Sequence, residues 1–145
     1  MPSKPVGEPT APLSRVHPDG NLLAEFPVQL EQELCAPLLA RPGLRIERIV
    51  SLGHASPDGF WYDQAGEEWV LLVAGAARLR FEGAPAMELG PGDHLLIPSH
   101  ARHRVEWTDP GQPTVWLALH LDSPARTGAT DASTADPRNV DDPTR

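Results

Sequence analysis

A glutamate and a histidine occupy positions where this sequence otherwise places core side chains. Glu68 shares its strand parity with Leu72 in the run EEWVLLV, and His103 shares its parity with Val105 and Trp107 in HRVEW. Burying a charged or polar group without a partner is costly. We therefore expect the carboxylate and the imidazole to serve a purpose, either as ligands of a divalent metal ion or as hydrogen-bonding groups for an organic molecule.

Two predicted hairpins carry these residues. The apolar runs Trp69–Val73 and Ala76–Phe81 are separated only by Ala-Gly, which is typical of a tight β-hairpin. The runs His94–Ile97 and His103–Trp107 are separated by PSHAR, whose proline interrupts the strand. The sequence thus predicts four strands in this central stretch.

The flanking segments extend the same architecture. Strands are predicted over Leu44–Leu52, with a bulge near Arg48, and over Val115–Leu121. The spacing of leucines predicts a short helix over Leu30–Leu39, and Asn21–Phe26 is either a short strand or an arm that packs on the core. Short strands punctuated by Gly and Pro are typical of an antiparallel sandwich or barrel. The predicted fold class is all-β, a barrel with a short N-terminal helix or arm.

Composition bounds the organisation and the partners of the chain. The 145 residues leave room for one domain, which we place at 19–122 between a disordered N-terminal arm (1–18) and a disordered C-terminal tail (123–145), because both ends lack apolar periodicity. The net charge of −8, with no cluster of basic residues, argues against nucleic acid as a partner.

The single cysteine, Cys35, excludes an internal disulfide and fits a reducing compartment. No apolar run approaches the length of a membrane span or a signal segment. We therefore expect a cytoplasmic protein without a membrane partner.

The central stretch resembles the two motifs of the cupin superfamily, G(X)5HXH(X)3–4E(X)6G and G(X)5PXG(X)2H(X)3N. Glu68 is followed after six residues by Gly75, as in the first motif, and Gly92 is followed after five residues by Pro98, as in the second. His103 then occupies the position of the second motif's histidine. The resemblance implies a cupin-type jelly-roll β-barrel that holds a divalent metal ion in its mouth.

The sequence departs from this pattern at the HXH pair. Depending on the spacer length, its two positions hold Trp61 and Asp63 or Tyr62 and Gln64. Two imidazole ligands are therefore missing, and His100 replaces the glycine of the second motif. The remaining candidate ligands, for iron, manganese, nickel or zinc, are Glu68 and His103, with Asp63 or Gln64, and as weaker candidates His100, which could equally be an exposed turn residue, and His120.

Three classes of function remain open. The chain could be a metal-dependent oxygenase, isomerase or lyase, a non-catalytic cupin that binds a small ligand without metal, or a scaffold with a closed barrel. Trp61, Tyr62 and Trp107 would form an aromatic wall for a small organic molecule, and a sugar phosphate is disfavoured because no basic residue accompanies them. The strand Trp69–Val73 is apolar on both faces, which predicts a homodimer.

Overall fold

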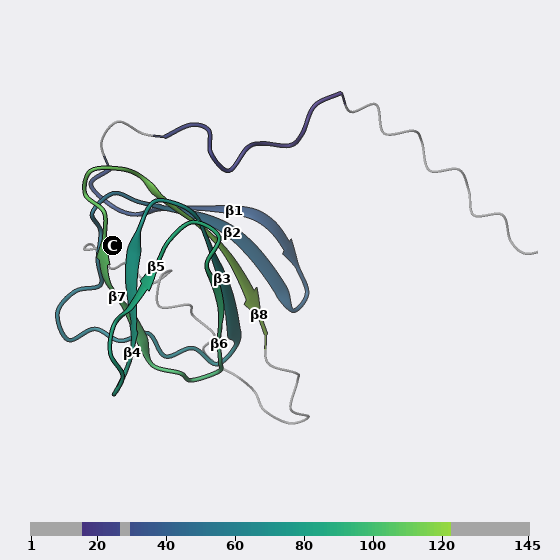
Figure 1. Cartoon of the computed structure of the whole chain (residues 1–145). Helices are drawn as coiled ribbons and strands as arrows, with labels where there is room; N and C mark the ends of the chain where they lie inside the picture. The colour runs from purple at the N-terminus through teal and green to yellow at the C-terminus, as the bar shows by residue number, and fades with distance from the viewer. Residues whose placement is uncertain (1–15, 27–29, 123–145) are drawn as a thin grey trace, which may run out of the picture.

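The computed structural model describes residues 16–26 and 30–122, and this part of the chain folds into two antiparallel β-sheets (Figure 1). The larger sheet has five strands in the order β1-β2-β8-β3-β6, and the smaller has three in the order β5-β4-β7. The strands are β1 (Leu34–Arg41), β2 (Leu44–Ser51), β3 (Glu67–Ala74), β4 (Ala77–Phe81), β5 (Met87–Leu89), β6 (His94–Ile97), β7 (His103–Thr108) and β8 (Thr114–Leu121). The sheets face each other as in a jelly roll, which confirms the predicted all-β fold.

The strands predicted to form hairpins lie in different sheets. β3 pairs with β6 and β8, whereas β4 pairs with β5 and β7, so the chain crosses from the larger to the smaller sheet between them. Gly75 makes this crossing at a φ of 92°. A Cβ there would lie 2.5 Å from the Cα of Thr114, so the start of β8 leaves no room for a side chain. The predicted hairpins are wrong, although the strands themselves form.

The helix predicted over Leu30–Leu39 is also wrong, because this region forms strand β1. β1 pairs with β2 along its length and turns into it through Gly43, whose φ is 78°. The leucine spacing only approximates a helical period, and pairing with β2 gives this segment backbone hydrogen bonds that stabilise a strand more than the local preference stabilises a helix. The bulge lies on β1, between Pro37 and Leu39, and β2 pairs with β8 without a register shift near Arg48.

The segment Asn21–Phe26 is an arm that packs on the outer face of β2. The guanidinium of Arg48 donates to the carbonyl oxygens of Leu22, at 2.9 Å, and Ala24, at 2.6 Å. It also lies over the ring of Phe26, with 5.3 Å between its central carbon and the ring centroid. These contacts provide partners for the guanidinium of Arg48, which is only 9% exposed.

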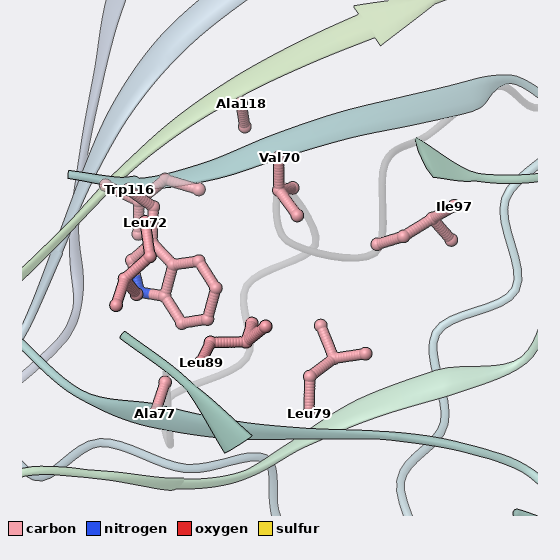
Figure 2. Packing of buried hydrophobic residues seen from close by; sticks show 9 residues of the cluster. Val70, Leu72, Ala77, Leu79, Leu89, Ile97, Trp116 and Ala118 are labelled. Carbon is pink, nitrogen blue, oxygen red and sulfur yellow. The ribbon is translucent and has the colours of Figure 1, made fainter. Parts of the chain in front are cut away.

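The apolar core lies between the two sheets (Figure 2). Inward-facing residues of the larger sheet meet those of the smaller sheet because alternate residues of a strand share one face. The buried cluster comprises Ile49, Val70, Leu72, Ala77, Leu79, Leu89, Ile97, Trp116 and Ala118. This packing fixes the strands on which the candidate site residues lie.

The predicted disordered arm, apart from 16–18, and the predicted tail at 123–145 lie outside the described residues, so both stay predictions. In the part of the chain that is described, no helix has the length and hydropathy needed to cross a membrane.

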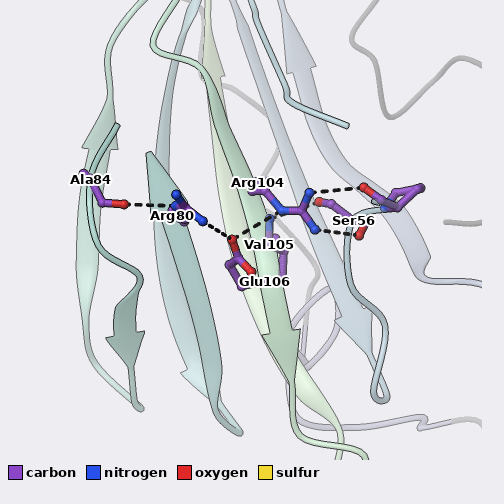
Figure 3. A network of polar contacts seen from close by, with 7 residues as sticks. Ser56, Arg80, Ala84, Arg104, Val105 and Glu106 are labelled. Carbon is purple, nitrogen blue, oxygen red and sulfur yellow. Dashed lines mark hydrogen bonds and ion pairs between the residues drawn. The ribbon is translucent and has the colours of Figure 1, made fainter. Parts of the chain in front are cut away.

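A segment between β2 and β3 is tied to β7 by a polar network (Figure 3). Ser56 exchanges two hydrogen bonds with the backbone of Val105, and the Arg104 guanidinium donates to the carbonyl oxygens of Ser56 and Pro57. The carboxylate of Glu106 lies between this guanidinium and that of Arg80. The network anchors the chain a few residues before Tyr62, which enters the site.

Candidate ligand-binding cavity in the barrel

A cavity of about 30 Å³ lies between the sheets. A single water molecule needs roughly 10–15 Å³ on this measure, so the cavity admits a few waters or part of one small ligand. Its lining combines an apolar wall with four polar side chains, which are Glu33, Tyr62, Glu68 and His103; the apolar residues are Ile49, Val70, Leu79, Val105 and Trp116. The structure therefore brings Glu68 and His103 to one cavity, as strand parity predicted.

Glu68 projects inward from β3 and is only 4% exposed. Its strand neighbours are Ile97 on β6 and His120 on β8, which are its direct cross-strand partners. One carboxylate oxygen lies 3.4 Å from Nδ1 of His120. Glu68 thus has a partner on the side away from the cavity, and this partner holds a carboxylate that would otherwise be costly to bury.

His120 lies between two carboxylates. Its Nε2 is 2.6 Å from Oε1 of Glu47 on β2, while Nδ1 faces Glu68. All three side chains are buried, so the ring is held between the two carboxylates inside the barrel. His120 is not a cavity-lining residue, and as a candidate metal ligand it is already engaged by these carboxylates.

The orientation of His103 is fixed by its own backbone neighbourhood. Nδ1 lies 2.8 Å from the carbonyl oxygen of Ala101, which can only accept, so Nδ1 carries the proton. Tyr62 stacks on this ring at a centroid distance of 5.3 Å and exchanges backbone hydrogen bonds with the same residue. These contacts hold the imidazole at the cavity wall.

Of the predicted aromatic wall, only Tyr62 lines the cavity. A register shift between β4 and β7 makes Glu106 an extra residue in β7, so Trp107 pairs with outward-facing Arg78 instead of continuing the parity of His103. Trp61 also lies outside, where it packs against guanidinium groups. The placement of these two tryptophans in the wall is therefore wrong, and the tryptophan that lines the cavity is Trp116.

Asp63 and His100 lie together at the surface, and neither they nor Gln64 line the cavity. Nδ1 of His100 is 2.8 Å from Oδ1 of Asp63, and both side chains are about half or more exposed. The backbone of His100 donates to the carbonyl oxygen of Gln64 at 2.6 Å, and His100 adopts a left-handed φ of 58°. These contacts join two loops and pair the carboxylate of Asp63 with His100.

The described residues do not fit a metal centre of the kind that the resemblance implies. Glu68 and His103 supply two possible ligands, but Asp63 is paired with His100, and His120 lies between carboxylates. Nowhere in residues 16–26 and 30–122 do three His, Cys, Asp or Glu side chains come close enough together to hold a metal ion. The other predicted ligand, Gln64, does not line the cavity, and a metal site with three protein ligands requires three donors close together.

Glu33 is a cavity residue that the sequence reasoning missed. It lies just before β1, and its Oε2 accepts a hydrogen bond of 2.8 Å from the hydroxyl of buried Ser51. Because this region was predicted as helix, strand parity could not be applied to it. Had β1 been recognised, the pairing of its residues with β2 would have placed Glu33 opposite Ser51, on the inward face.

The comparisons with known proteins agree with this fold. The family model for the cupin domain matches residues 53–120. A solved structure of a candidate mannose-6-phosphate isomerase from Ralstonia eutropha JMP134 is 53% identical, with a TM-score of 0.71; the match covers 74% of this chain and 100% of that one. An RmlC-like cupin with a double-stranded β-helix fold from Methanocaldococcus jannaschii is 14% identical, with a TM-score of 0.54 over 68% of this chain and 87% of that one, and supports the fold alone.

A third similar structure is the DMSP lyase DddQ from Ruegeria pomeroyi DSS-3, at 26% identity and a TM-score of 0.53. That match covers 65% of this chain and 49% of the lyase, so this chain spans about half the length of that enzyme. No match was found among the curated proteins. The chain belongs to the cupin superfamily.

Proposed function

We propose that this cupin binds a small organic molecule in its barrel through Glu68 and His103. The observation that carries the proposal is that both side chains, 4% and 3% exposed, line one cavity whose remaining wall is largely apolar. Small-molecule sites are typically apolar cavities with a few convergent polar groups. A closed scaffold would gain more stability from apolar side chains at these two positions.

Hydrogen-bonding capacity supports a particular class of ligand. The carboxylates of Glu33 and Glu68 can only accept hydrogen bonds when they are ionised. Such a lining complements a molecule that carries several O–H or N–H donors. An uncharged polyol or a small amine meets this requirement.

Anionic ligands are disfavoured by the same lining. Among the described residues, no lysine or arginine lines the cavity, whereas two carboxylates do. A phosphate group normally binds to cationic side chains or to clustered backbone amides. The phosphate of mannose 6-phosphate would therefore find no counter-charge in the cavity, although the similar protein from Ralstonia eutropha JMP134 is described as a candidate isomerase of that sugar phosphate.

A second candidate function is proton transfer, as in an isomerase or a lyase. It is favoured because two side chains that can exchange protons, Glu68 and His103, line one cavity. Glu68 would take a proton from a ligand carbon and return it, so that no external oxidant or reductant is needed. The 53% identity to a candidate isomerase supports this class. The oxygenase reading loses support because the described residues do not assemble the metal ligands it requires.

The proposal is tested by titrating the ¹⁵N-labelled protein with mannose, glycerol, ethanolamine and mannose 6-phosphate, followed by NMR. We expect the uncharged and cationic probes to shift the amide signals of Tyr62 and His103 and the phosphate to be the weakest. In Glu68→Gln the affinity should fall about tenfold, which corresponds to about 1.4 kcal/mol. Glu88→Gln, a change to an exposed carboxylate on β5, is the matched control and should bind normally.

Three outcomes separate the alternatives. Tighter binding of mannose 6-phosphate than of mannose at the same amides would contradict the ligand class. Calorimetric binding of Zn²⁺, Ni²⁺, Mn²⁺ or Fe²⁺ that His103→Ala abolishes would favour the metal-dependent reading instead. For proton transfer, incorporation of deuterium into mannose in D₂O should depend on Glu68 and not on Glu88; no incorporation would leave binding as the function.

A further inference from the structure

One carboxylate of the cavity comes from outside the barrel strands. Glu33 lies in the segment that leads into β1, whereas Glu68 and His103 lie on β3 and β7. The side chain of Glu33 is half-buried and lines the same cavity. Connecting segments commonly carry binding residues, because such a segment can change without disturbing the sheet that supports it. This placement is therefore typical of a residue that sets specificity.

Strand register explains why the side chain of Glu33 turns inward. Leu34, the first residue of β1, pairs with Val50 of β2. The same register places Glu33 opposite Ser51, the last residue of β2. Ser51 is two residues beyond Ile49, which lines the cavity, and alternate residues of a strand share one face. The position of Glu33 thus follows from the backbone pairing at the start of β1.

Two neighbouring side chains hold the carboxylate of Glu33. The hydroxyl of Ser51 donates to Oε2 at 2.8 Å, and the thiol of Cys35 lies 3.9 Å from Oε1. Ser51 is fully buried, and its hydroxyl is a stronger donor than a thiol. A carboxylate offers about four acceptor positions, so these contacts fix its direction and are compatible with a contact to a ligand.

The charges of the lining favour a cationic ligand. Glu33 and Glu68 contribute carboxylates, and no lysine or arginine among the described residues lines the cavity. A hydrogen bond between a carboxylate and a cationic donor is stronger than one to a neutral donor, because charge assists it. An ammonium group should therefore bind in this cavity more tightly than a hydroxyl group of the same size.

We propose that Glu33 is a specificity-determining residue, which selects a small ligand with a protonated amino group over an uncharged polyol. The inference rests on the proposed function of the cavity and narrows it to one class of ligand. Glu33 contacts the ammonium group from the segment before β1. Ser51 is a positioning residue that keeps the carboxylate directed into the cavity.

A matched pair of probes tests this preference on the full-length wild-type chain. Ethanolamine and ethylene glycol differ only by an ammonium group in place of a hydroxyl. Each is titrated at pH 7 while the amide signals of Tyr62 and His103 are followed by NMR. We expect ethanolamine to bind about tenfold more tightly, because a hydrogen bond to a charged group contributes more than one between neutral groups.

The outcomes for the wild type separate the inference from the proposed function. Equal affinities, or tighter binding of ethylene glycol, would overturn the inference and leave the proposed function intact. No response to either probe would also overturn the inference, and a further lack of response to mannose and glycerol would overturn the proposed function with it.

Variants test whether Glu33 causes the preference. In Glu33→Gln, which preserves shape, the ratio of the two dissociation constants should fall to about threefold or less, because a neutral amide cannot supply the charge. Ser51→Ala should lower the ratio in the same direction. Glu31→Gln, a change to an exposed carboxylate on the same segment, is the matched control and should leave the ratio unchanged.

The ratio of affinities distinguishes specificity from a general loss of structure. A merely structural role of Glu33 or Ser51 would weaken the binding of both probes equally and leave the ratio unchanged. An unchanged ratio in Glu33→Gln would overturn the specificity role, and an unchanged ratio in Ser51→Ala would overturn the positioning role. If Ser51→Ala does not fold, the wild type and Glu33→Gln still decide the role of Glu33.

Discussion

The interior of the barrel is built differently at its two ends, although the same strands pass through both. Along β3 the inward residues run from Glu68 to Leu72, and along β8 they run from His120 to Trp116. The apolar end is packed with aliphatic and aromatic side chains (Figure 2), whereas the polar end holds buried ionisable groups. The contrast indicates that one end provides stability and the other is free to provide chemistry.

The largest expected effect comes from the apolar end. Leu72→Ala removes a side chain that is 1% exposed, and the residual cavity should lower the free energy of unfolding by about 2–5 kcal/mol. Urea denaturation measures the change. Met87→Ala, at a position 41% exposed on β5, is the control and should change stability by no more than about 0.5 kcal/mol. Equal effects at the two positions would mean that the apolar end is not the source of stability.

At the polar end, a single substitution should destabilise the fold, and a combined replacement should recover much of the loss. Glu47→Ala removes the hydrogen-bond partner of Nε2 of buried His120 and should destabilise the fold by about 1–3 kcal/mol. Replacing all three buried side chains together, as Glu47→Leu with Glu68→Leu and His120→Phe, should restore much of the lost stability. Apolar groups fill the space and leave no polar group to be desolvated.

Denaturation of the single and triple variants, together with the probe titration, separates stability from function. The triple variant should be folded but unable to bind the uncharged probes. A triple variant as unstable as Glu47→Ala would show that the polar end is needed for folding, and the comparison between the two ends would fail.

Strand parity was sufficient to predict the two central residues of the polar end. Glu68 and His103 lie on regular stretches of β3 and β7, so the period-two rule places them inward. It failed for Trp107 because a single extra residue in β7 reverses the parity beyond it. No local pattern in the run HRVEW marks that bulge.

Other features depend on contacts between distant segments. The two expected hairpins follow the local rule for short connections, yet their strands pair with partners in different sheets. The position of Glu33 in the cavity and the hydrogen bond between Glu47 and His120 both depend on residues that are far apart in the sequence. Asp63 was a reasonable ligand candidate by spacing, and only the tertiary structure shows that it contacts His100.

The outer faces of the sheets also differ, and this difference predicts an interface. The outer face of the larger sheet carries the half-buried side chain of Trp69 and the exposed side chain of Leu96, whereas the smaller sheet exposes Arg78 and Arg80. We propose that a second copy of this chain covers the apolar face to form a homodimer, because charged residues are depleted at the core of such interfaces.

Light scattering tests the dimer. The wild-type chain should have the mass of a dimer at micromolar concentration, and Trp69→Glu should reduce it to that of a monomer. Arg78→Glu on the smaller sheet is the control and should remain dimeric. A monomeric wild type would rule out this interface.

The smallest expected effect lies in the turn that joins β7 to β8 at the apolar end. There the amide of Gly111 and the side-chain amide of Gln112 donate to Asp109, each at 2.8 Å, and these bonds hold the pKa of its carboxyl below its ordinary value. A lowered pKa in the folded state means that Asp109 contributes stability above the unfolded value of about 3.9, and that this contribution is lost as the pH falls through the folded value.

Asp109→Asn keeps an oxygen acceptor but removes the charge, so it isolates this contribution. Because the carboxylate is fully exposed, the variant should be only slightly less stable than the wild type at pH 7, and the gap should close as the solution is acidified below pH 4. Thermal unfolding of both proteins across this range measures the gap. A gap that widens on acidification would mean that Asp109 stabilises the turn in its protonated form, contrary to the direction of its pKa.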